Sequence, residues 1–149
     1  MTNTVLMLAT LLTLAAACGR AAAQEPDRNG LLLEWRFDGD FRDTSGNNHH
    51  GTPTGNCAFA PGREGQCLSL DGKRSFVTSD TTLPTLTDTF TVECWVKPAA
   101  EQVQYADILG NHEGTFTGFA IQQEGSQTNR YYFTYGTGSA WVYSHPVPL

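Results

Sequence analysis

Beyond residue 30 the chain consists of short apolar runs separated by turn-forming residues, and this pattern constrains the fold more than any other feature. No segment there keeps a 3.6-residue apolar period over the roughly 10–12 residues that predict a helix. Glycine, serine, threonine, asparagine and aspartate fill the gaps between the runs. Several short strands at turn-punctuated spacing predict one all-β domain, an antiparallel two-sheet sandwich or barrel.

The clearest predicted strand covers residues 89–97. Apolar side chains alternate strictly with polar or mixed ones over this run. Successive side chains of a strand point to opposite faces, so this period of two predicts one buried and one partly wet face. Cys94 falls on the buried side and is predicted to be a buried thiol. Pro98 ends the run because it has no N–H to donate.

Shorter runs predict further strands. They cover residues 31–37, 68–70, 75–79, 105–109, 119–122, 131–135 and 141–143. Asp71-Gly72 stands between the second and third of these runs. Such a dipeptide is typical of a tight turn, so residues 68–79 are predicted to form a hairpin.

The N-terminus has the features of an export signal. Residues 5–17 are apolar apart from Thr10 and Thr13. This run is shorter than the ~20 residues that span a bilayer and has the length of a signal-peptide core, so no transmembrane span is predicted. Small residues precede Gln24, which predicts a signal peptide over residues 1–23, a polar leader over 24–30 and a domain over 31–149.

A lipoprotein is the alternative route of export. Residues 14–18 (LAAAC) resemble a bacterial lipobox, in which Cys18 would be lipidated and become the new N-terminus. Either reading predicts a secreted or cell-surface protein.

The charge of the chain argues against nucleic acid and anionic lipid as partners. Nine Lys and Arg stand against 15 Asp and Glu, a net charge of −6, and removal of Arg20 with the signal peptide makes it −7. Lys73 and Arg74 form the only pair of neighbouring basic residues after residue 30. Phosphate contacts need clustered cations, which this chain does not supply.

Cys57 and Cys67 predict a disulfide. Export permits disulfides, and the segment between the two cysteines contains Pro61, Gly62 and Gly65, which favour a chain reversal. Closing so short a loop would contribute roughly 2–3 kcal/mol. Zinc is the alternative, but the sequence has no CxxC motif and no histidines at zinc-finger spacing.

Five blocks of sequence resemble LamG-like domains of the concanavalin A-like lectin/glucanase superfamily, in that family's order. They are LEWRFDG (33–39), DTSGNNHHG (43–51), GQCLSLDG (65–72), FV (76–77) and FTVECWVKP (90–98). The resemblance implies an antiparallel two-sheet jelly roll. Family members continue with further strands, so it also implies that residues 31–149 are the N-terminal part of a truncated domain.

The resemblance implies a calcium site near the first loop, a place where family members often hold this ion. Oxygen-bearing side chains are dense there, at Asp38, Asp40, Asp43, Asn47 and Asn48. Calcium takes six to eight oxygen ligands, and such a loop can supply them. Asp38, Asp43 and Asn47 are the candidate ligands. The alternative is a turn in which these side chains bond their own backbone.

Catalysis is not expected. The glucanases of this superfamily use an E-x-D-x-x-E motif, which the chain lacks, and no G-x-S-x-G motif is present. His49 and His50 are expected to be a solvated loop pair. We therefore expect a non-catalytic module that recognises carbohydrate or an extracellular protein. A degenerate glycosidase-like sandwich and a structural spacer are the alternatives.

The last 20 residues are rich in aromatic side chains. Tyr131, Tyr132, Tyr135, Trp141 and Tyr143 lie there. Sugars are held by aromatic faces together with polar groups, but packing within the sandwich is the expected role of these rings. The sequence alone assigns no ligand-binding residue.

Overall fold

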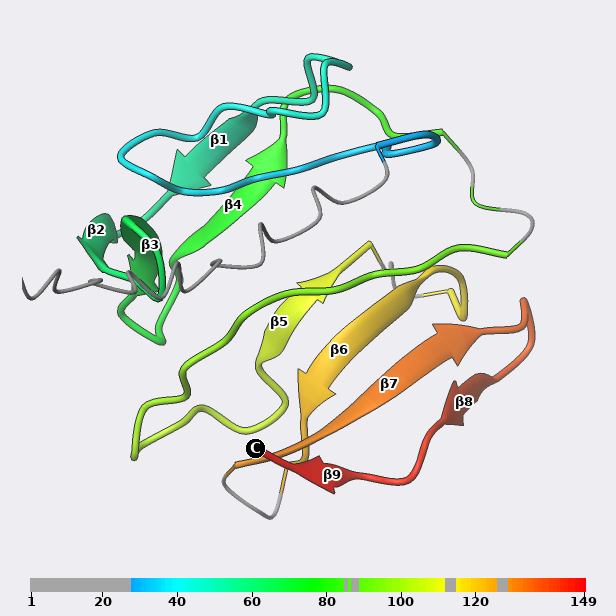
Figure 1. Ribbon diagram of the computed structural model, residues 1–149. Helices are drawn as coiled ribbons and strands as arrows, with labels where there is room; N and C mark the ends of the chain where they lie inside the picture. The colour runs from blue at the N-terminus through cyan, green and yellow to red at the C-terminus, as the bar shows by residue number, and fades with distance from the viewer. Residues whose placement is uncertain (1–27, 85, 87–88, 112–114, 126–128) are drawn as a thin grey trace, which may run out of the picture.

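The computed structural model describes residues 28–84, 86, 89–111, 115–125 and 129–149 (Figure 1). These residues form an all-β protein with several small antiparallel sheets and, within the described ranges, no helix. The predicted signal peptide lies outside them. The described part of the chain contains no helix with the length and apolar character needed to cross a bilayer.

Two two-stranded sheets occupy the first half of the described chain. Strand β1 (Gly51–Thr54) pairs with β4 (Phe76–Ser79), and β2 (Cys57–Pro61) pairs with β3 (Gln66–Leu70). Strands β1 and β2 are not predicted from the sequence, because their prolines, Pro53 and Pro61, count against a strand. Proline is tolerated here because each strand has one paired neighbour, so one edge needs no N–H.

A five-stranded sheet forms the second half. Its strands are β5 (Asp107–Gly110), β6 (Phe119–Gln123), β7 (Arg130–Gly136), β8 (Trp141–Tyr143) and β9 (Val147–Pro148). The order is β5-β6-β7-β8, and β9 pairs with the start of β7. The predictions of β6, β7 and β8 are confirmed, and β5 begins two residues later than predicted. Strand β9 was missed because it is only two residues long.

The predicted hairpin over residues 68–79 is wrong, although both of its strands exist. Strand β3 turns back to β2, with Leu70 opposite Cys57, while β4 pairs with β1. The Asp71 carboxylate accepts hydrogen bonds from the Lys73 N–H (3.0 Å) and the Ser75 hydroxyl (2.5 Å). The Asp-Gly turn therefore connects two sheets instead of the two strands of one hairpin.

The first predicted strand, residues 31–37, does not join a sheet. Its one ladder contact is an isolated bridge between Trp35 and Asp43. Phe37 has a φ of 54°, a left-handed conformation that interrupts an extended strand. This segment is held to the following loop mainly by side chains.

Residues 89–97, the clearest predicted strand, are extended but lie outside every sheet. Figure 1 shows them as the segment that crosses between the upper sheets and the five-stranded sheet. Trp95 is 83% exposed, and the Arg63 guanidinium lies 3.7 Å from its ring centroid. Cys94 is exposed as well, which contradicts the predicted buried thiol. The apolar and polar side chains alternate as predicted, but no strand of the described chain pairs with this segment, so its apolar side is not buried.

The predicted Cys57–Cys67 disulfide is also wrong, because both thiols are free. The two residues share a hairpin, but Cys67 lies opposite Ala60, three positions from Cys57 along β2. Three strand positions are about 10 Å and an odd offset reverses the face. A disulfide needs Cα atoms within about 7 Å and Cβ atoms that point together.

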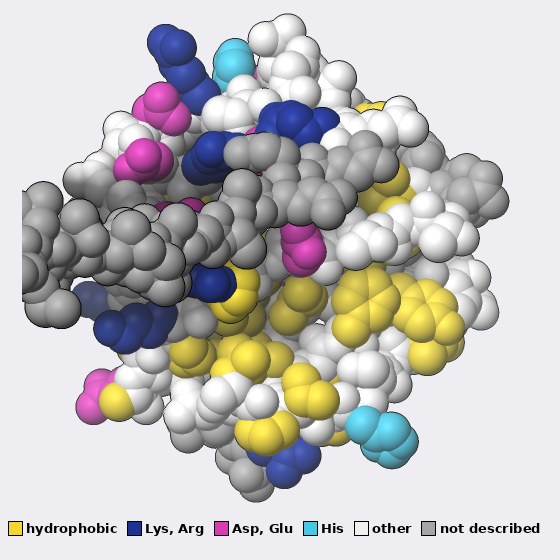
Figure 2. Space-filling view, in the orientation of Figure 1, with side chains coloured by type: hydrophobic (Ala, Val, Ile, Leu, Met, Phe, Trp, Pro, Cys, Tyr) yellow, Lys and Arg dark blue, Asp and Glu magenta, His cyan; other side chains and the backbone are white. Residues whose placement is uncertain are grey.

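The main apolar contacts are made by two groups of aromatic rings, although Ala120 and Tyr131 are the only hydrophobic residues of the described chain that are buried. Phe41 contacts Phe37 and Phe59 in the first half, with ring centroids 6.2 and 5.0 Å apart. Phe119 contacts Phe90 and Phe133 in the second half, at 5.0 and 5.9 Å. Figure 2 shows hydrophobic side chains reaching the surface over the lower part of the molecule. Much apolar area in the described chain thus remains in contact with solvent.

Candidate functional site

The loop of residues 38–50 is organised by the carboxylate of Asp43, which is only 8% exposed. One oxygen accepts hydrogen bonds from the Glu34 and Ser45 N–H groups (3.0 and 2.8 Å). The other accepts from the Ser45 hydroxyl (2.7 Å) and the His49 N–H (3.0 Å). One side chain thus joins residues 34 and 49 and replaces the missing sheet ladder.

These donors set the protonation of Asp43. Burial alone would raise the pKa of the carboxyl, but the hydrogen bonds from Glu34, Ser45 and His49 outweigh it and lower the pKa from 3.8 to about 2. Asp43 is therefore ionised at neutral pH and fully engaged with the protein.

The other two candidate calcium ligands are also engaged in the loop. Asp38 accepts a hydrogen bond from the Gln66 N–H (2.9 Å). Asn47 donates from its amide to the carbonyls of Leu31 and Leu32 (2.8 and 3.1 Å). Among the described residues, no group of three or more His, Cys, Asp or Glu side chains has the arrangement of a metal site. The calcium site at Asp38, Asp43 and Asn47 stays a prediction.

The histidines of this loop are half-buried, unlike the solvated pair that was expected. The His50 Nδ1 accepts a hydrogen bond from the Asp43 N–H (3.1 Å). The His49 ring lies 2.5 Å from the Thr81 hydroxyl. Both rings therefore connect the loop to neighbouring backbone and side chains.

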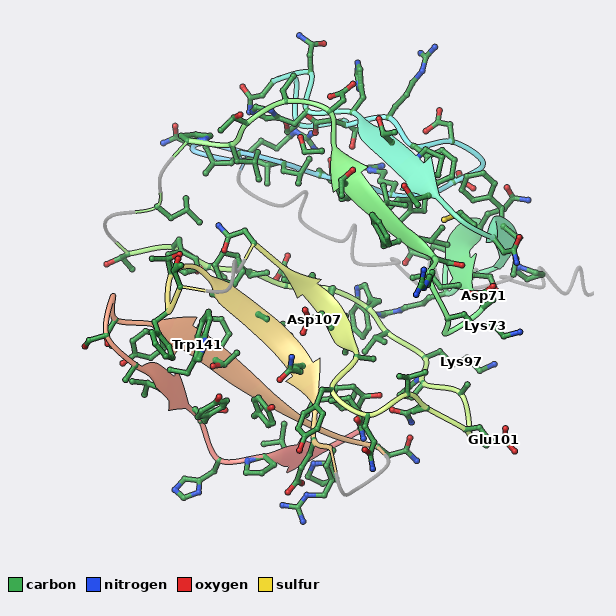
Figure 3. All side chains as sticks on the ribbon, turned by 180° about the vertical axis from the view of Figure 1, so that it is seen from behind. Asp71, Lys73, Lys97, Glu101, Asp107 and Trp141 are labelled. Atoms are coloured by element: carbon green, nitrogen blue, oxygen red, sulfur yellow. The ribbon has the colours of Figure 1, made fainter. Side chains whose placement is uncertain are left out.

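The five-stranded sheet carries a second group of polar and aromatic side chains. Residues directly opposite in an antiparallel ladder share a face. One side of the sheet therefore holds four such pairs: Asp107–Gln122, Gln122–Tyr132, Thr134–Tyr143 and Gly136–Trp141. We call this side, defined by Asp107, Gln122, Tyr132, Thr134, Trp141 and Tyr143, the polar-aromatic face. Figure 3 labels Asp107 and Trp141 on the sheet, seen from behind.

A chain of contacts runs across the strands on this face. The Gln122 amide donates to the Asp107 carboxylate (2.8 Å) and its carbonyl accepts from the Tyr132 hydroxyl (2.5 Å). The Tyr132 and Tyr143 rings meet edge to face, with centroids 5.2 Å apart. Tyr143 is 56% exposed, so its ring is available to a ligand.

Each end of the polar-aromatic face is bounded by a defined contact. At one end Phe116 packs against Trp141, with centroids 6.2 Å apart. The Phe116 carbonyl lies where a Cβ on Gly136 would stand, so glycine is needed there. At the other end Glu124 and Arg130 form an ion pair of 3.1 Å.

The hydroxyl of Tyr132 stays protonated over the physiological range. Burial raises the pKa of this phenol, and the neighbouring Tyr143, Tyr105, Asp107 and Glu124 raise it further because a second negative charge there is unfavourable. Tyr132 is therefore a fixed hydrogen-bond donor to Gln122.

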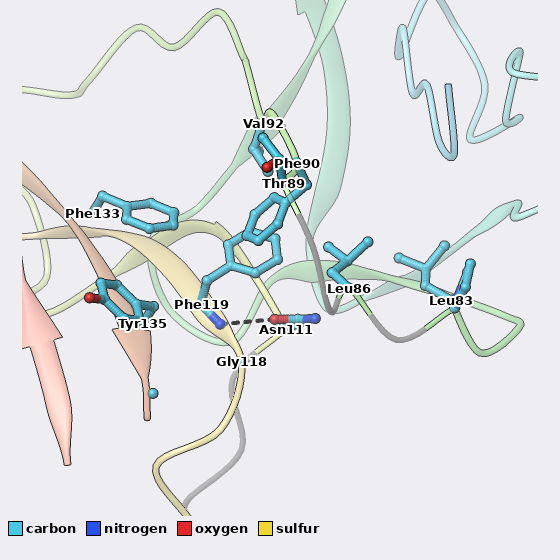
Figure 4. Close-up of a pocket in the computed structure, with 12 residues that line it drawn as sticks. Leu83, Leu86, Thr89, Phe90, Val92, Asn111, Gly118, Phe119, Phe133 and Tyr135 are labelled. Atoms are coloured by element: carbon cyan, nitrogen blue, oxygen red, sulfur yellow. Dashed lines mark hydrogen bonds between the residues drawn. The ribbon is translucent and has the colours of Figure 1, made fainter. Parts of the chain in front are cut away.

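The opposite side of the sheet carries mainly apolar side chains, together with the buried side chain of Gln123. Phe119, Phe133 and Tyr135 line a cavity of about 670 Å³ together with Leu83, Leu86 and Phe90 (Figure 4). Asn111 closes one wall, and its side-chain oxygen accepts a hydrogen bond from the Phe119 N–H (3.0 Å). Thr89 also lines the cavity, so its walls combine apolar and polar groups.

The aromatic residues of the last 20 positions divide between these two sides. Tyr131 is 5% exposed and packs as expected for core. Tyr135 shares its side of the sheet, whereas Tyr132, Trp141 and Tyr143 belong to the polar-aromatic face. The alternation of side chains along a strand predicts that the odd and even positions of residues 131–135 lie on opposite sides of the sheet. Only the strand register shows that Gln122 and Asp107 lie on the same side as Tyr132.

The comparisons with known proteins found no matching family model and no significant match among curated proteins or solved structures. The assignment of function therefore depends on the geometry of the described residues.

Proposed function

We propose that this protein is an exported, non-catalytic recognition module that binds carbohydrate on the polar-aromatic face of its five-stranded sheet. The proposal includes the LamG-like jelly-roll sandwich implied by the sequence blocks. The observation that carries it is the juxtaposition of Tyr132, Trp141 and Tyr143 with Asp107 and Gln122 on one side of one sheet.

This combination suits a sugar for physical reasons. A pyranose ring presents C–H groups on its faces and hydroxyls at its rim. Exposed aromatic rings offer apolar area with little entropy to lose, while amide and carboxylate groups pair with the hydroxyls. Tyr143 on β8 provides the exposed ring, and Gln122 on β6 and Asp107 on β5 provide the polar groups two and three strands further on.

Catalysis is not part of the proposal. The Asp107 carboxylate is bonded to the Gln122 amide, and the Glu124 carboxylate is paired with the Arg130 guanidinium. A glycosidase needs one protonated and one ionised carboxyl beside the scissile bond.

Protein recognition is the second candidate, and residues 89–97 favour it. Trp95 is 83% exposed on an extended segment that belongs to no sheet of the described chain. An extended segment with unpaired backbone groups can add a strand from another protein. A purely structural spacer would use neither surface.

A glycan array and a reducing-sugar assay on the same preparation test the proposal. We expect binding to at least one class of oligosaccharide, no release of sugar, and at least a tenfold loss of affinity in Tyr143→Ala, about 1.4 kcal/mol. Tyr135→Ala is the matched control, since it removes a similarly exposed ring from the other side of the sheet. Release of sugar, or equal loss in both variants, would contradict the proposal.

A further inference from the structure

We propose that residues 89–97 pair with the same residues of a second copy of the chain, as an antiparallel β-ladder in which Trp95 lies opposite its own counterpart. The proposal is independent of carbohydrate recognition, because the polar-aromatic face lies on other strands. It follows from three properties of residues 89–97, namely their backbone, their exposure and the order of their charges.

The backbone of residues 89–97 is extended but has no ladder partner in the described chain. None of these residues has a positive φ, and none forms a strand pair or a backbone hydrogen bond with another described residue. Every residue of the segment except Val92 is exposed. An exposed, extended segment with unpaired N–H and C=O groups is a template for a strand from another molecule.

One side of the segment carries a negative charge, an indole and a positive charge in that order. Glu93, Trp95 and Lys97 share this side because side chains alternate along an extended chain, and all three are exposed. Neither Glu93 nor Lys97 forms an ion pair with a described residue. The Arg63 guanidinium lies 3.7 Å from the Trp95 ring centroid, yet Trp95 remains 83% exposed. Figure 3 shows the Lys97 side chain extending outward from the ribbon.

This order is complementary to itself when one copy is reversed. In an antiparallel pair centred on Trp95, each Glu93 lies opposite the Lys97 of the other copy, and the two indoles lie opposite each other. Opposite charges and aromatic rings in directly opposed positions stabilise a ladder. A pair centred on Glu93 or on Lys97 would instead place like charges opposite each other. The charges therefore select the register centred on Trp95.

Pro98 agrees with this register. In an antiparallel ladder, every second residue directs its N–H and C=O groups to the neighbouring strand. If Glu93, Trp95 and Lys97 occupy these positions, the even-numbered residues direct their backbone groups away from the second copy. Pro98 then lies where its missing N–H costs no hydrogen bond.

A second copy of the chain suits the segment better than an unrelated strand for a symmetry reason. A two-fold axis through the Trp95 pair makes each favourable contact occur twice and closes the assembly as a dimer. The interface is small, because a single nine-residue ladder supplies it. We therefore expect a reversible dimer with a Kd in the micromolar range, roughly 10 µM.

The test is sedimentation of the full chain over roughly 1–200 µM, which brackets the expected Kd. We expect a monomer at the low end and a dimer at the high end. Glu93→Lys and Lys97→Glu should each weaken the dimer at least about tenfold, because each places two like-charged pairs in the ladder. The double variant Glu93→Lys/Lys97→Glu should bring the Kd back to within about threefold, since it restores opposite charges in reversed order.

Glu101→Lys is the matched control, because it makes the same change in charge at an exposed position outside the segment (Figure 3). It should leave the Kd within about threefold. Trp95→Ala should weaken the dimer at least about tenfold, and circular dichroism of each variant checks that the fold is kept. A chain that stays monomeric at the highest concentration would overturn the proposal. A dimer that the double variant does not restore, or that Glu101→Lys weakens as much as Glu93→Lys, would overturn it as well.

Discussion

The loop of residues 38–50 and the five-stranded sheet are held by different kinds of hydrogen bond. In the sheet, backbone groups pair strand to strand, so its cohesion does not depend on any single side chain. In the loop, four bonds converge on the single carboxylate of Asp43. A substitution at Asp43 should therefore destabilise the loop far more than any surface substitution destabilises the sheet.

Removal of the Asp43 carboxylate should have the largest effect. Asp43→Ala leaves the Glu34, Ser45 and His49 N–H groups without their acceptor, and we expect a loss of about 3 kcal/mol in the free energy of unfolding. Denaturant titration measures it. Asp40→Ala, at an exposed position of the same loop, should cost less than about 0.5 kcal/mol. Equal losses would show that the loop is not organised by Asp43.

Calcium provides the next test, because the predicted site shares its oxygens with this network. A cation bound to the folded state at 100 times its Kd would add about 2.7 kcal/mol, a melting shift of roughly 5 °C. The measurement is thermal melting in calcium, in magnesium and in chelator, for the native chain and for Asp38→Asn. The predicted site requires a calcium-specific shift that the variant loses. Identical melting curves would leave the loop as a turn held by Asp43 alone.

Acid should weaken the loop before it affects the sheet. The folded pKa of Asp43 is about 2 against 3.8 for an unperturbed group, so its contribution is complete above about pH 4. It is lost as the pH falls through 2, and this shift corresponds to about 2 kcal/mol. Unfolding free energies between pH 5 and 2 measure this dependence. Asp43→Asn should be less stable at neutral pH and should flatten the curve in that window.

The two tryptophans Trp35 and Trp95 give a smaller, matched contrast. The indole of Trp35 donates to the His49 carbonyl (2.9 Å), whereas Trp95 is 83% exposed. Trp35→Phe should therefore cost about 1 kcal/mol, and Trp95→Phe less than about 0.5. Chemical denaturation of both variants measures the difference. A larger cost for Trp95 would mean that residues 89–97 are packed in solution.

Reductant should have the smallest effect. Because Cys57 and Cys67 are offset by three strand positions, thermal melting with and without reductant should coincide. Alkylation under native conditions should label Cys67 and Cys94, which are both exposed. A Cys57–Cys67 peptide in a non-reducing digest would restore the bridge and require a shifted register for β2 and β3.

The sequence by itself determined the strand content of the second half. Alternation and turn residues placed β6, β7 and β8, because a period of two depends only on which side chains a strand can bury. The same alternation is strictest at residues 89–97, yet these residues join no described sheet. Periodicity reports what a strand would bury, but a ladder needs a neighbouring backbone, which local sequence does not specify.

The tertiary structure alone decided which strands pair and in which register. It moved β3 from β4 to β2, separated Cys57 from Cys67, and placed the Asp43 carboxylate where it accepts hydrogen bonds from distant backbone N–H groups. It also brought Asp107 beside Gln122 and Tyr132, which are 15 and 25 positions away along the chain. Composition and alternation are local properties, whereas strand register depends on contacts between distant residues, and the polar-aromatic face depends on that register.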